Sequence, residues 1–324
     1  MAGTGRGYRL VVQSPAQARL AAGAGAVNRT VASLLFLLLV QLTLTGALYW
    51  QGKGSVEHRA RLLAPEEALR IDEIHISDDQ DGEVVLRQSR GRWLLPELQD
   101  LPADQSRVSR LLDTLSRQPQ GFPVASSAAA RQRYRVTSYQ YHRRLTFYHG
   151  DNLQQTVYLG RSPAYRRVYA RNSRDNDIYN LRYSQHDAPV SADAWLDRRL
   201  LQTAPSRIEM QGLALERGTD GQWQMNGGRQ PDSQQLGSLL QLLKELRVTG
   251  LADEDSQRSL AEDGIVQRSF RLWQEGQNHR LDLLAFDGKL YAHDSRYPPF
   301  FSVDPRQYLA LLQLDRARLT GNAP

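Results

Sequence analysis

Cysteine is absent from all 324 residues of the sequence. Its absence excludes disulfides, cysteine-ligated zinc, iron–sulfur clusters and thiol nucleophiles. Recognisable catalytic patterns are missing as well, because the sequence contains no GxSxG turn, no Walker loop, no GxGxxG fingerprint and no histidine pair spaced for zinc on a helix. We therefore predict no catalytic residue, no cofactor-binding residue and no metal ligand, and we expect the protein not to be an enzyme.

Charged residues are absent from one long stretch, residues 30–50, which reads TVASLLFLLLVQLTLTGALYW. A helix rises about 1.5 Å per residue, so these 21 residues cover the roughly 30 Å hydrocarbon core of a bilayer. Acidic residues are absent before Glu57, whereas four arginines precede the stretch. Because positive charge stays on the cytoplasmic side, we predict a cytoplasmic basic tail (1–29), a single transmembrane helix (30–50) in the inner, cytoplasmic membrane, and a periplasmic or otherwise extracytoplasmic body.

An alternative explanation of this stretch is a cleaved secretory signal peptide. The apolar part of such a peptide is usually about 7–15 residues long and ends in small residues. The stretch here is longer, and Thr45-Gly46-Ala47 is a poor cleavage site, so an uncleaved signal anchor is favoured. Gln41 lies inside the predicted helix, where its amide is either tolerated or bonded to a partner helix as a membrane-helix contact.

The part of the chain after the predicted membrane helix is expected to be folded. The whole sequence is 40% hydrophobic and 23% charged, which is ordinary for a globular protein. The length after residue 50 suits one large domain or two small ones. We predict a linker over residues 51–63, a first α+β repeat over 64–204 and a second α+β repeat over 205–324.

Two segments of this body resemble each other. Gly91-Arg92-Trp93 recurs 130 residues later as Gly221-Gln222-Trp223. A helix is predicted after each, with Asp104 and Asp232 as N-caps and with identical spacing from the cap to an apolar stripe. The stripe residues are Val108, Leu111, Leu112 and Leu115 in the first copy and Leu236, Leu239, Leu240 and Leu243 in the second. The shared spacing predicts a duplicated unit.

Alternating strand patterns surround each predicted helix, for example at Leu145 and Phe147 in the first copy. Each copy is expected to close with a short helix, which starts at Ser191 in one copy and at Asp304-Pro305 in the other. Turns rather than long helices join the strands. The predicted fold class is therefore α+β, with one N-terminal transmembrane helix followed by two similar units of mainly antiparallel sheet plus helices.

Further short motifs make the body similar to a known protein family. They are Leu62-Leu63-Ala64-Pro65, Ile71-Asp72-Glu73-Ile74-His75-Ile76, Val84-Val85-Leu86, Trp93-Leu94-Leu95-Pro96, Pro102-Ala103-Asp104, Leu111-Leu112-Asp113-Thr114-Leu115, Leu159-Gly160 and Val168-Tyr169-Ala170-Arg171. On these packing and turn residues the chain resembles the family called domain of unknown function 4340, over residues 60–320. The resemblance implies a single-span, envelope-exposed protein that accompanies ABC-type export systems, and it assigns no catalytic residue.

One acidic segment looks like a metal site but lacks the required ligands. Asp78-Asp79-Gln80-Asp81-Gly82 resembles part of a calcium loop, yet Ser77 and Gln88 stand where an Asp and a bidentate Glu are needed. We interpret this segment as an acidic hairpin turn. His75 stands between two isoleucines, which predicts that it lies on the polar side of a strand.

Residues 131–182 are rich in arginine and tyrosine, with eleven arginines against three aspartates. Arginine with interleaved tyrosine binds anionic or aromatic partners through bidentate hydrogen bonds and stacking. The candidate residues for an anionic partner are Arg133, Arg135, Arg143, Arg144, Arg166, Arg167, Tyr141 and Tyr165. The alternative is an arginine-rich sheet face on which each arginine stem covers a neighbouring tyrosine.

These observations leave three functions open. The leading expectation is a membrane-anchored, non-enzymatic accessory component of an ABC-type transport or export assembly, with the membrane and the permease and ATPase subunits as partners. The alternative is an extracytoplasmic binding module for an anionic lipid or glycan, and the third is an enzyme with an unrecognised site. An extracytoplasmic body argues against nucleic acid as a partner. No cofactor is expected, and the sequence leaves the oligomeric state open.

Overall fold

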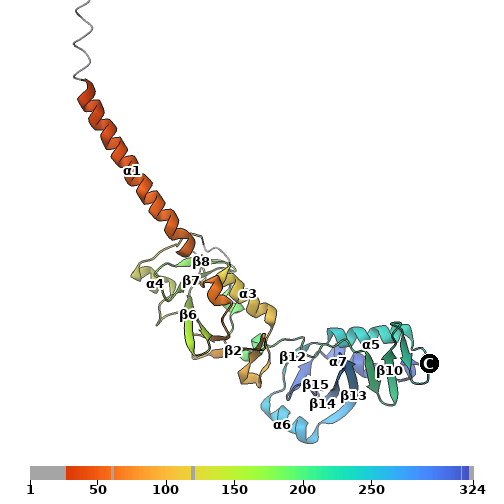
Figure 1. Ribbon diagram of the computed structural model, residues 1–324. Helices are drawn as coiled ribbons and strands as arrows, with labels where there is room; N and C mark the ends of the chain where they lie inside the picture. The colour runs from red at the N-terminus through yellow and green to blue at the C-terminus, as the bar shows by residue number, and fades with distance from the viewer. Residues whose placement is uncertain (1–26, 60–61, 118–120, 315, 321–324) are drawn as a thin grey trace, which may run out of the picture. The chain divides into compact units, whose positions relative to one another are not determined.

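The computed structural model describes residues 27–59, 62–117, 121–314 and 316–320 of the chain. The chain divides into two compact units, Met1–Arg59 and Ala60–Pro324. The first unit contains one helix, and the second contains two sheets with their helices (Figure 1). Most of the predicted cytoplasmic tail, residues 1–26, lies outside the described residues.

Helix α1 runs from Val27 to Arg59. It includes the whole predicted span and continues past Trp50, so the first part of the predicted linker, residues 51–59, is helical. No proline interrupts this part, and each added helical residue gains one backbone hydrogen bond. In the described part of the chain, no helix meets the length and apolarity needed to cross a bilayer. The membrane span therefore stays a prediction.

The first sheet has eight strands in the order β4-β3-β2-β1-β5-β6-β7-β8, and all neighbours are antiparallel. The strands are β1 (Glu73–Ser77), β2 (Glu83–Ser89), β3 (Arg92–Leu95), β4 (Leu101–Pro102), β5 (Arg143–His149), β6 (Asn152–Leu159), β7 (Val168–Asn172) and β8 (Tyr179–Leu181). Side chains alternate between the two faces of each strand. Leu145 and Phe147 therefore enter the core, and His75 lies half-buried on the opposite face, as predicted.

The second sheet also has eight antiparallel strands, in the order β11-β10-β9-β13-β14-β15-β16-β12. They are β9 (Arg207–Met210), β10 (Leu213–Arg217), β11 (Trp223–Met225), β12 (Val248–Leu251), β13 (Ile265–Gln274), β14 (Gln277–Phe286), β15 (Lys289–Asp294) and β16 (Phe300–Val303). Two antiparallel sheets with helices confirm the α+β class. Below, first repeat and second repeat denote the parts of the chain that carry the first and the second sheet.

The pairing register shows that the two repeats are equivalent. Ile74 pairs with Leu86 in the first sheet, and Ile208 pairs with Leu215 in the second. Two residues further along β2 and β10, Gln88 pairs with Trp93 and Arg217 pairs with Trp223. The two tryptophans therefore occupy the same place in the two sheets. The seven strands common to both sheets follow one order, and the sheets differ only in the added edge strand, β4 in one and β12 in the other.

Helices α3 (Gln105–Ser116) and α5 (Ser233–Glu245) are the predicted helices of the two copies. The Asp104 carboxylate accepts hydrogen bonds from two amides of the first turn of α3, and the Asp232 carboxylate accepts one from the first turn of α5. These caps satisfy amides that have no partner inside the helix. Three of the four stripe residues are buried in each helix, and Leu112 and Leu240 are partly buried against the same core. The predicted core stripes are confirmed.

The shorter helices are α2 (Pro65–Ala68), α4 (Ala128–Tyr134), α6 (Glu254–Asp263), α7 (Pro305–Gln313) and α8 (Arg316–Leu319), with 3-10 turns η1 (Pro96–Leu98), η2 (Gln185–Asp187) and η3 (Ala192–Trp195). Helix α7 follows its Asp304 cap as predicted. The helix predicted after Ser191 is wrong in extent, because only the single turn η3 forms. Leu196 is extended there and forms a β-bridge with Ala103, which ends the turn.

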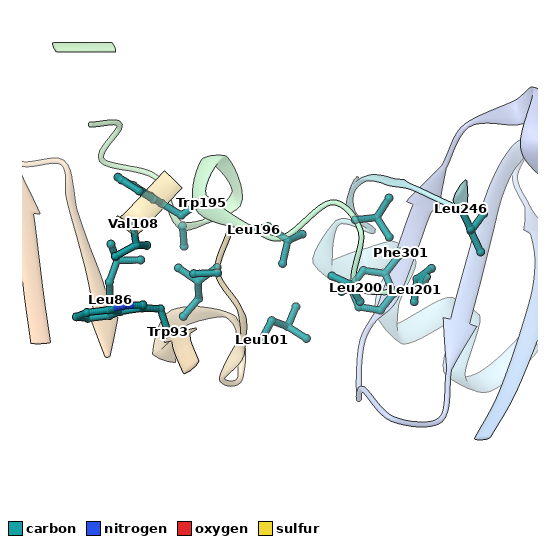
Figure 2. Packing of buried hydrophobic residues seen from close by; sticks show 14 of the residues in the cluster. Leu86, Trp93, Leu101, Val108, Trp195, Leu196, Leu200, Leu201, Leu246 and Phe301 are labelled. Carbon is teal, nitrogen blue, oxygen red and sulfur yellow. The ribbon is translucent and has the colours of Figure 1, made fainter. Parts of the chain in front are cut away.

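The segment between the two repeats is hydrogen-bonded to both of them. The amide of Asp197 donates to the carbonyl of Pro102 in the first repeat, and the carbonyl of Arg198 accepts from the amide of Val248 in the second. Leu196, Leu200 and Leu201 of this segment are buried in the core. Figure 2 shows them between Trp93 and Trp195 of the first repeat and Leu246 and Phe301 of the second. The two sheets therefore share one continuous hydrophobic core.

Candidate anion-binding site

The structure divides the eight residues that the sequence suggested for an anionic partner among three places. Arg133 lies in α4 and Arg135 follows it directly; Tyr141 precedes β5, which begins with Arg143 and Arg144; and Tyr165, Arg166 and Arg167 lie in the loop between β6 and β7. All three places are in the first repeat, and the cavity described below includes only the residues of the third place.

Arginines on the face of the first sheet away from the main core lie over tyrosines. The Arg144 guanidinium is 5.5 Å from the centre of the Tyr141 ring, and the Arg171 guanidinium is 4.9 Å from the Tyr158 ring. Arg144 also donates to the Ser77 hydroxyl at 3.1 Å. This arrangement agrees with the alternative interpretation of the sequence, in which arginine stems pack over tyrosines on a sheet face.

Arg143 is occupied by contacts inside the protein. Its Nε donates to the carbonyl of Ala188 at 2.9 Å, its Nη1 donates to the carbonyl of His142 at 2.7 Å, and Nη1 lies 3.6 Å from the Asp78 carboxylate. Asp78 accepts from the Gly82 amide at 2.9 Å, which closes the predicted hairpin turn between β1 and β2. Arg143 therefore stabilises this turn and is not available to a ligand.

One cavity in the first repeat gathers arginines from three separate segments. Its volume is about 660 Å³. Its lining residues are Arg110 and Thr114 from α3, Tyr165, Arg166 and Arg167 from the β6–β7 loop, Arg182 and Tyr183 just after β8, and Asp187 from η2. This cavity, named here the arginine pocket, contains three of the eight predicted residues.

The arginine pocket carries an excess of positive charge. Among the residues that the structure describes, the guanidinium groups of its four arginines form no hydrogen bond and no ion pair. Asp187 is the one acidic residue in the lining, so the lining has an excess of three positive charges. Unpaired guanidinium groups have donors free in a planar fork that fits phosphate and carboxylate oxygens. The pocket is thus suited to an anion.

Arg107 of α3 holds one wall of the pocket. Its guanidinium donates to the carbonyls of Asp187 at 3.4 Å, His186 at 3.3 Å and Ala194 at 2.5 Å, and it lies 4.9 Å from the ring of Trp195. Arg107 precedes Arg110 by three residues, so the same face of α3 fixes the wall and supplies a pocket arginine. The wall that carries Asp187 is therefore tied to the helix.

The loop that supplies three pocket residues is also held in place. The Ser162 hydroxyl lies 2.9 Å from the carbonyl oxygen of Ala164 and 2.6 Å from that of Arg167. The loop begins at Gly160, where a Cβ atom would lie 2.0 Å from the carbonyl oxygen of Tyr134, so only glycine allows this close approach. These contacts give the backbone of the loop a defined shape.

Tyr183 contributes a hydroxyl group to the pocket lining. Its side chain is 5% exposed and lines the pocket, and among the described residues its hydroxyl forms no hydrogen bond. Burial raises the pKa of the phenol, and the Asp187 carboxylate adds to the rise, while Arg107 and Arg110 oppose it. The phenol therefore stays protonated at neutral pH and offers a neutral hydrogen-bond donor beside the arginines.

The second repeat has no counterpart of the pocket loop. Residues 160–167 join β6 to β7, whereas β14 and β15 are joined by Asp287-Gly288 alone, a tight turn with positive φ at both residues. The position equivalent to Arg110, counted from the helix cap, is Ser238. The two repeats therefore share their strand order and helix, but the arginine pocket belongs to the first repeat. The difference comes from the longer β6–β7 loop and from the residues on the helix face.

Sequence reasoning missed Arg110, Thr114, Arg182, Tyr183 and Asp187. A weak signal was present, because Arg110 and Thr114 are four residues apart and share one face of α3. Arg182 lies inside the arginine-rich segment but was not singled out. Nothing in the spacing of these five residues shows that the fold brings them together.

Two further predictions concern a metal site and the membrane helix. No cluster of three potential metal ligands occurs within the residue ranges that the structure describes. Gln41 lies exposed on α1, and its carbonyl accepts a hydrogen bond from the Thr45 hydroxyl at 2.7 Å. This bond joins Thr45 to the backbone of Gln41 within one helix, so it does not involve the Gln41 side-chain amide, and a contact of that amide with a partner helix stays a prediction.

The fold and the pocket define a class of protein: a duplicated α+β protein with two eight-stranded antiparallel sheets and one arginine-lined cavity in the first repeat. The family model described as Domain of unknown function (DUF4340) matches residues 93–263, which is more than half of the chain. The chain belongs to this family, and the resemblance noted from its sequence is confirmed. No curated protein and no solved structure matches the chain. The matched region includes every residue of the arginine pocket.

Proposed function

We propose that the protein is a membrane-anchored, non-enzymatic binding protein of the cell envelope. The support for the anchor is the charge-free stretch 30–50, which lies within helix α1 and whose described apolar side chains are exposed. Four arginines precede this stretch and no acidic residue does, which supports a cytoplasmic N-terminus and an extracytoplasmic body.

This topology predicts the behaviour of a reporter fused after Pro324. An alkaline phosphatase, which is active only in the periplasm, is expected to be active there, because the charge asymmetry directs the body across the membrane. A cytoplasmic reporter at the same point is expected to be inactive, and it serves as the control. An inactive phosphatase together with an active cytoplasmic reporter would contradict the proposed localisation.

The function that the geometry supports best is binding of an anionic ligand in the arginine pocket. One observation carries this proposal: four guanidinium groups line one cavity without a hydrogen bond or ion pair among the described residues. Clustered like charges repel one another, so such a cluster lowers the stability of the folded protein unless a negative charge is bound between them. An anion neutralises the repulsion and accepts charge-assisted hydrogen bonds.

Titration of the full-length chain in a non-ionic detergent with inorganic pyrophosphate tests this function. Calorimetry is expected to show binding that weakens as salt rises, because salt screens exposed charges. Replacing two pocket arginines in the variant Arg110→Gln/Arg182→Gln is expected to weaken binding by roughly tenfold or more, since one charge-assisted hydrogen bond contributes about 1.5–3 kcal/mol.

The control for this titration is Arg133→Gln/Arg258→Gln, which changes the net charge equally but outside the pocket. Its affinity for pyrophosphate is expected to equal that of the wild type. Absence of wild-type binding at low salt, or an equal loss in the control, would rule out the arginine pocket as an anion site.

A role as an accessory component of an ABC-type export assembly is the wider context of this proposal. Its support is the single predicted membrane anchor joined to a large body without a recognisable catalytic motif, together with the context that the family resemblance implies. Purification of the full-length chain in mild detergent is expected to yield a permease and an ATPase as companions. Repeated recovery of the chain without either would count against this context and would leave the anion site untouched.

A further inference from the structure

We propose that the ligand of the arginine pocket is a phosphorylated sugar, either free or as part of a lipid headgroup. This inference rests on the proposed anion-binding function and names the class of anion. It follows from three properties of the lining: its volume, its charge, and the presence of a carboxylate and an exposed aromatic ring beside the arginines.

The volume indicates a ligand larger than a simple ion. The cavity measures about 660 Å³, which lies within the roughly 300–1,000 Å³ typical of small-molecule sites. A phosphate ion has only five heavy atoms, so it would leave most of this space to water. A phosphate ester of a six-carbon sugar fills such a cavity more fully and brings the dianionic group with it.

The charge of the lining favours phosphate over carboxylate. A phosphate monoester carries close to two negative charges at neutral pH and presents three acceptor oxygens. The pocket offers an excess of three positive charges and several guanidinium forks from different segments. Forks that approach from different directions suit a tetrahedral group with three oxygens better than a flat carboxylate with two. The protonated Tyr183 hydroxyl adds one neutral donor to this set.

The remaining lining residues suit a sugar. Asp187 would repel a bare anion, but its carboxylate is a strong acceptor for sugar hydroxyl groups. Tyr165 is 88% exposed at the pocket, with the Arg166 guanidinium 5.6 Å from its ring centre. An exposed ring in this place offers its apolar face to the C–H groups of a sugar ring, because these groups carry partial positive charge and the ring face is negative. Phosphate and sugar would thus each meet complementary groups.

Calorimetric titrations of the full-length chain in non-ionic detergent test the proposed class. The probes are hexose 6-phosphates (of glucose, mannose and N-acetylglucosamine), inorganic phosphate and free glucose. At least one hexose phosphate is expected to bind about tenfold more tightly than inorganic phosphate, and glucose alone is expected not to bind measurably, because the arginines supply most of the affinity.

Variants distinguish the contribution of the sugar to the affinity from that of the phosphate. Asp187→Asn and Tyr165→Ala are each expected to reduce the preference for the hexose phosphate over inorganic phosphate, while inorganic phosphate binds as before or more tightly. Tyr139→Ala is the matched control, because Tyr139 is 71% exposed and lies outside the pocket lining. Its preference is expected to be unchanged.

Vesicles that contain lipid A, whose headgroup is a phosphorylated glucosamine disaccharide, identify the source of the ligand. If the chain binds them and Arg110→Gln/Arg182→Gln does not, the sugar phosphate belongs to a lipid headgroup; if only free hexose phosphates bind, the ligand is soluble. Equal affinity for inorganic phosphate and every phosphorylated probe would overturn the sugar-phosphate class while leaving the anion site intact. Absence of any pyrophosphate binding would instead rule out the proposed anion-binding function itself.

Discussion

Replacing Leu239 with alanine is expected to lower the free energy of unfolding by about 2–5 kcal/mol, the usual loss for a buried leucine. Leu239 is fully buried on α5, so the shorter side chain leaves a cavity that close-packed neighbours fill only in part. Leu111 has the equivalent place on α3 and is equally buried. Leu111→Ala is therefore expected to cost a similar amount.

Urea unfolding of the full-length chain, followed by tryptophan fluorescence, measures both losses. The matched control is Leu309→Ala on α7, where the side chain is 47% exposed and truncation is expected to cost less than about 1 kcal/mol. A loss below about 0.5 kcal/mol at Leu111 or Leu239 would mean that the helix presents this residue to solvent, contrary to the fold described here.

A second large effect is expected from removing Arg296. Its guanidinium donates to both oxygens of Asp294, at 3.0 and 2.7 Å, and Asp294 is completely buried. The same guanidinium lies 3.4 Å from the carbonyl of Leu200, in the segment between the repeats. Arg296→Met leaves a buried carboxylate without its cation, so the free energy of unfolding is expected to fall by about 3–5 kcal/mol.

His279 makes this loss depend on pH. Its ring lies 3.7 Å from Asp294, and burial lowers its pKa, with Asp294 opposing and Arg296 adding to the fall. Removing Arg296 removes one cause of the lowered pKa, so the variant protonates His279 more readily and thereby stabilises Asp294 at acidic pH. In the wild type, His279 binds a proton more readily in the unfolded state than in the folded state, so the free energy of unfolding falls as pH falls. The destabilisation by Arg296→Met is therefore expected to be smaller at acidic than at alkaline pH.

The control for Arg296→Met is Arg258→Met in α6. Arg258 pairs with Asp255, but the side chains are 72% and 88% exposed, and exposed ion pairs contribute only about 0–1 kcal/mol. Urea unfolding compares the two variants. Equal small losses would show that the Asp294 carboxylate does not depend on Arg296.

The scaffold was predictable because it depends on local patterns. Asp104 and Asp232 cap helices at identical spacing from their apolar stripes, and Trp93 and Trp223 lie at the same register position. Hydrophobic periodicity, helix caps and turns depend on residues that are close in the sequence, so they can be recognised from a single sequence. The turn at Asp78 was recognisable for the same reason.

The pocket was predictable only in part, because it depends on distant segments. Arg110 and Arg182 are separated by 72 positions, and their approach follows from the packing of α3 beside the end of the first sheet. The sequence showed an excess of arginine and tyrosine but not which arginines are already bonded. Arg143 was a candidate, and only its contacts with Ala188 and Asp78 show that it is occupied.

The central claim, that the arginine pocket binds an anion, is tested most directly by arginine-selective dicarbonyl labelling of the full-length chain, with modified peptides identified by mass spectrometry. Arg110, Arg166, Arg167 and Arg182 are expected to be labelled in the free protein and protected when pyrophosphate is added, because the ligand covers their guanidinium groups. Arg133, exposed on α4 and outside the pocket, is expected to be labelled equally in both conditions. Protection of none of the four, or equal protection of Arg133, would contradict the account.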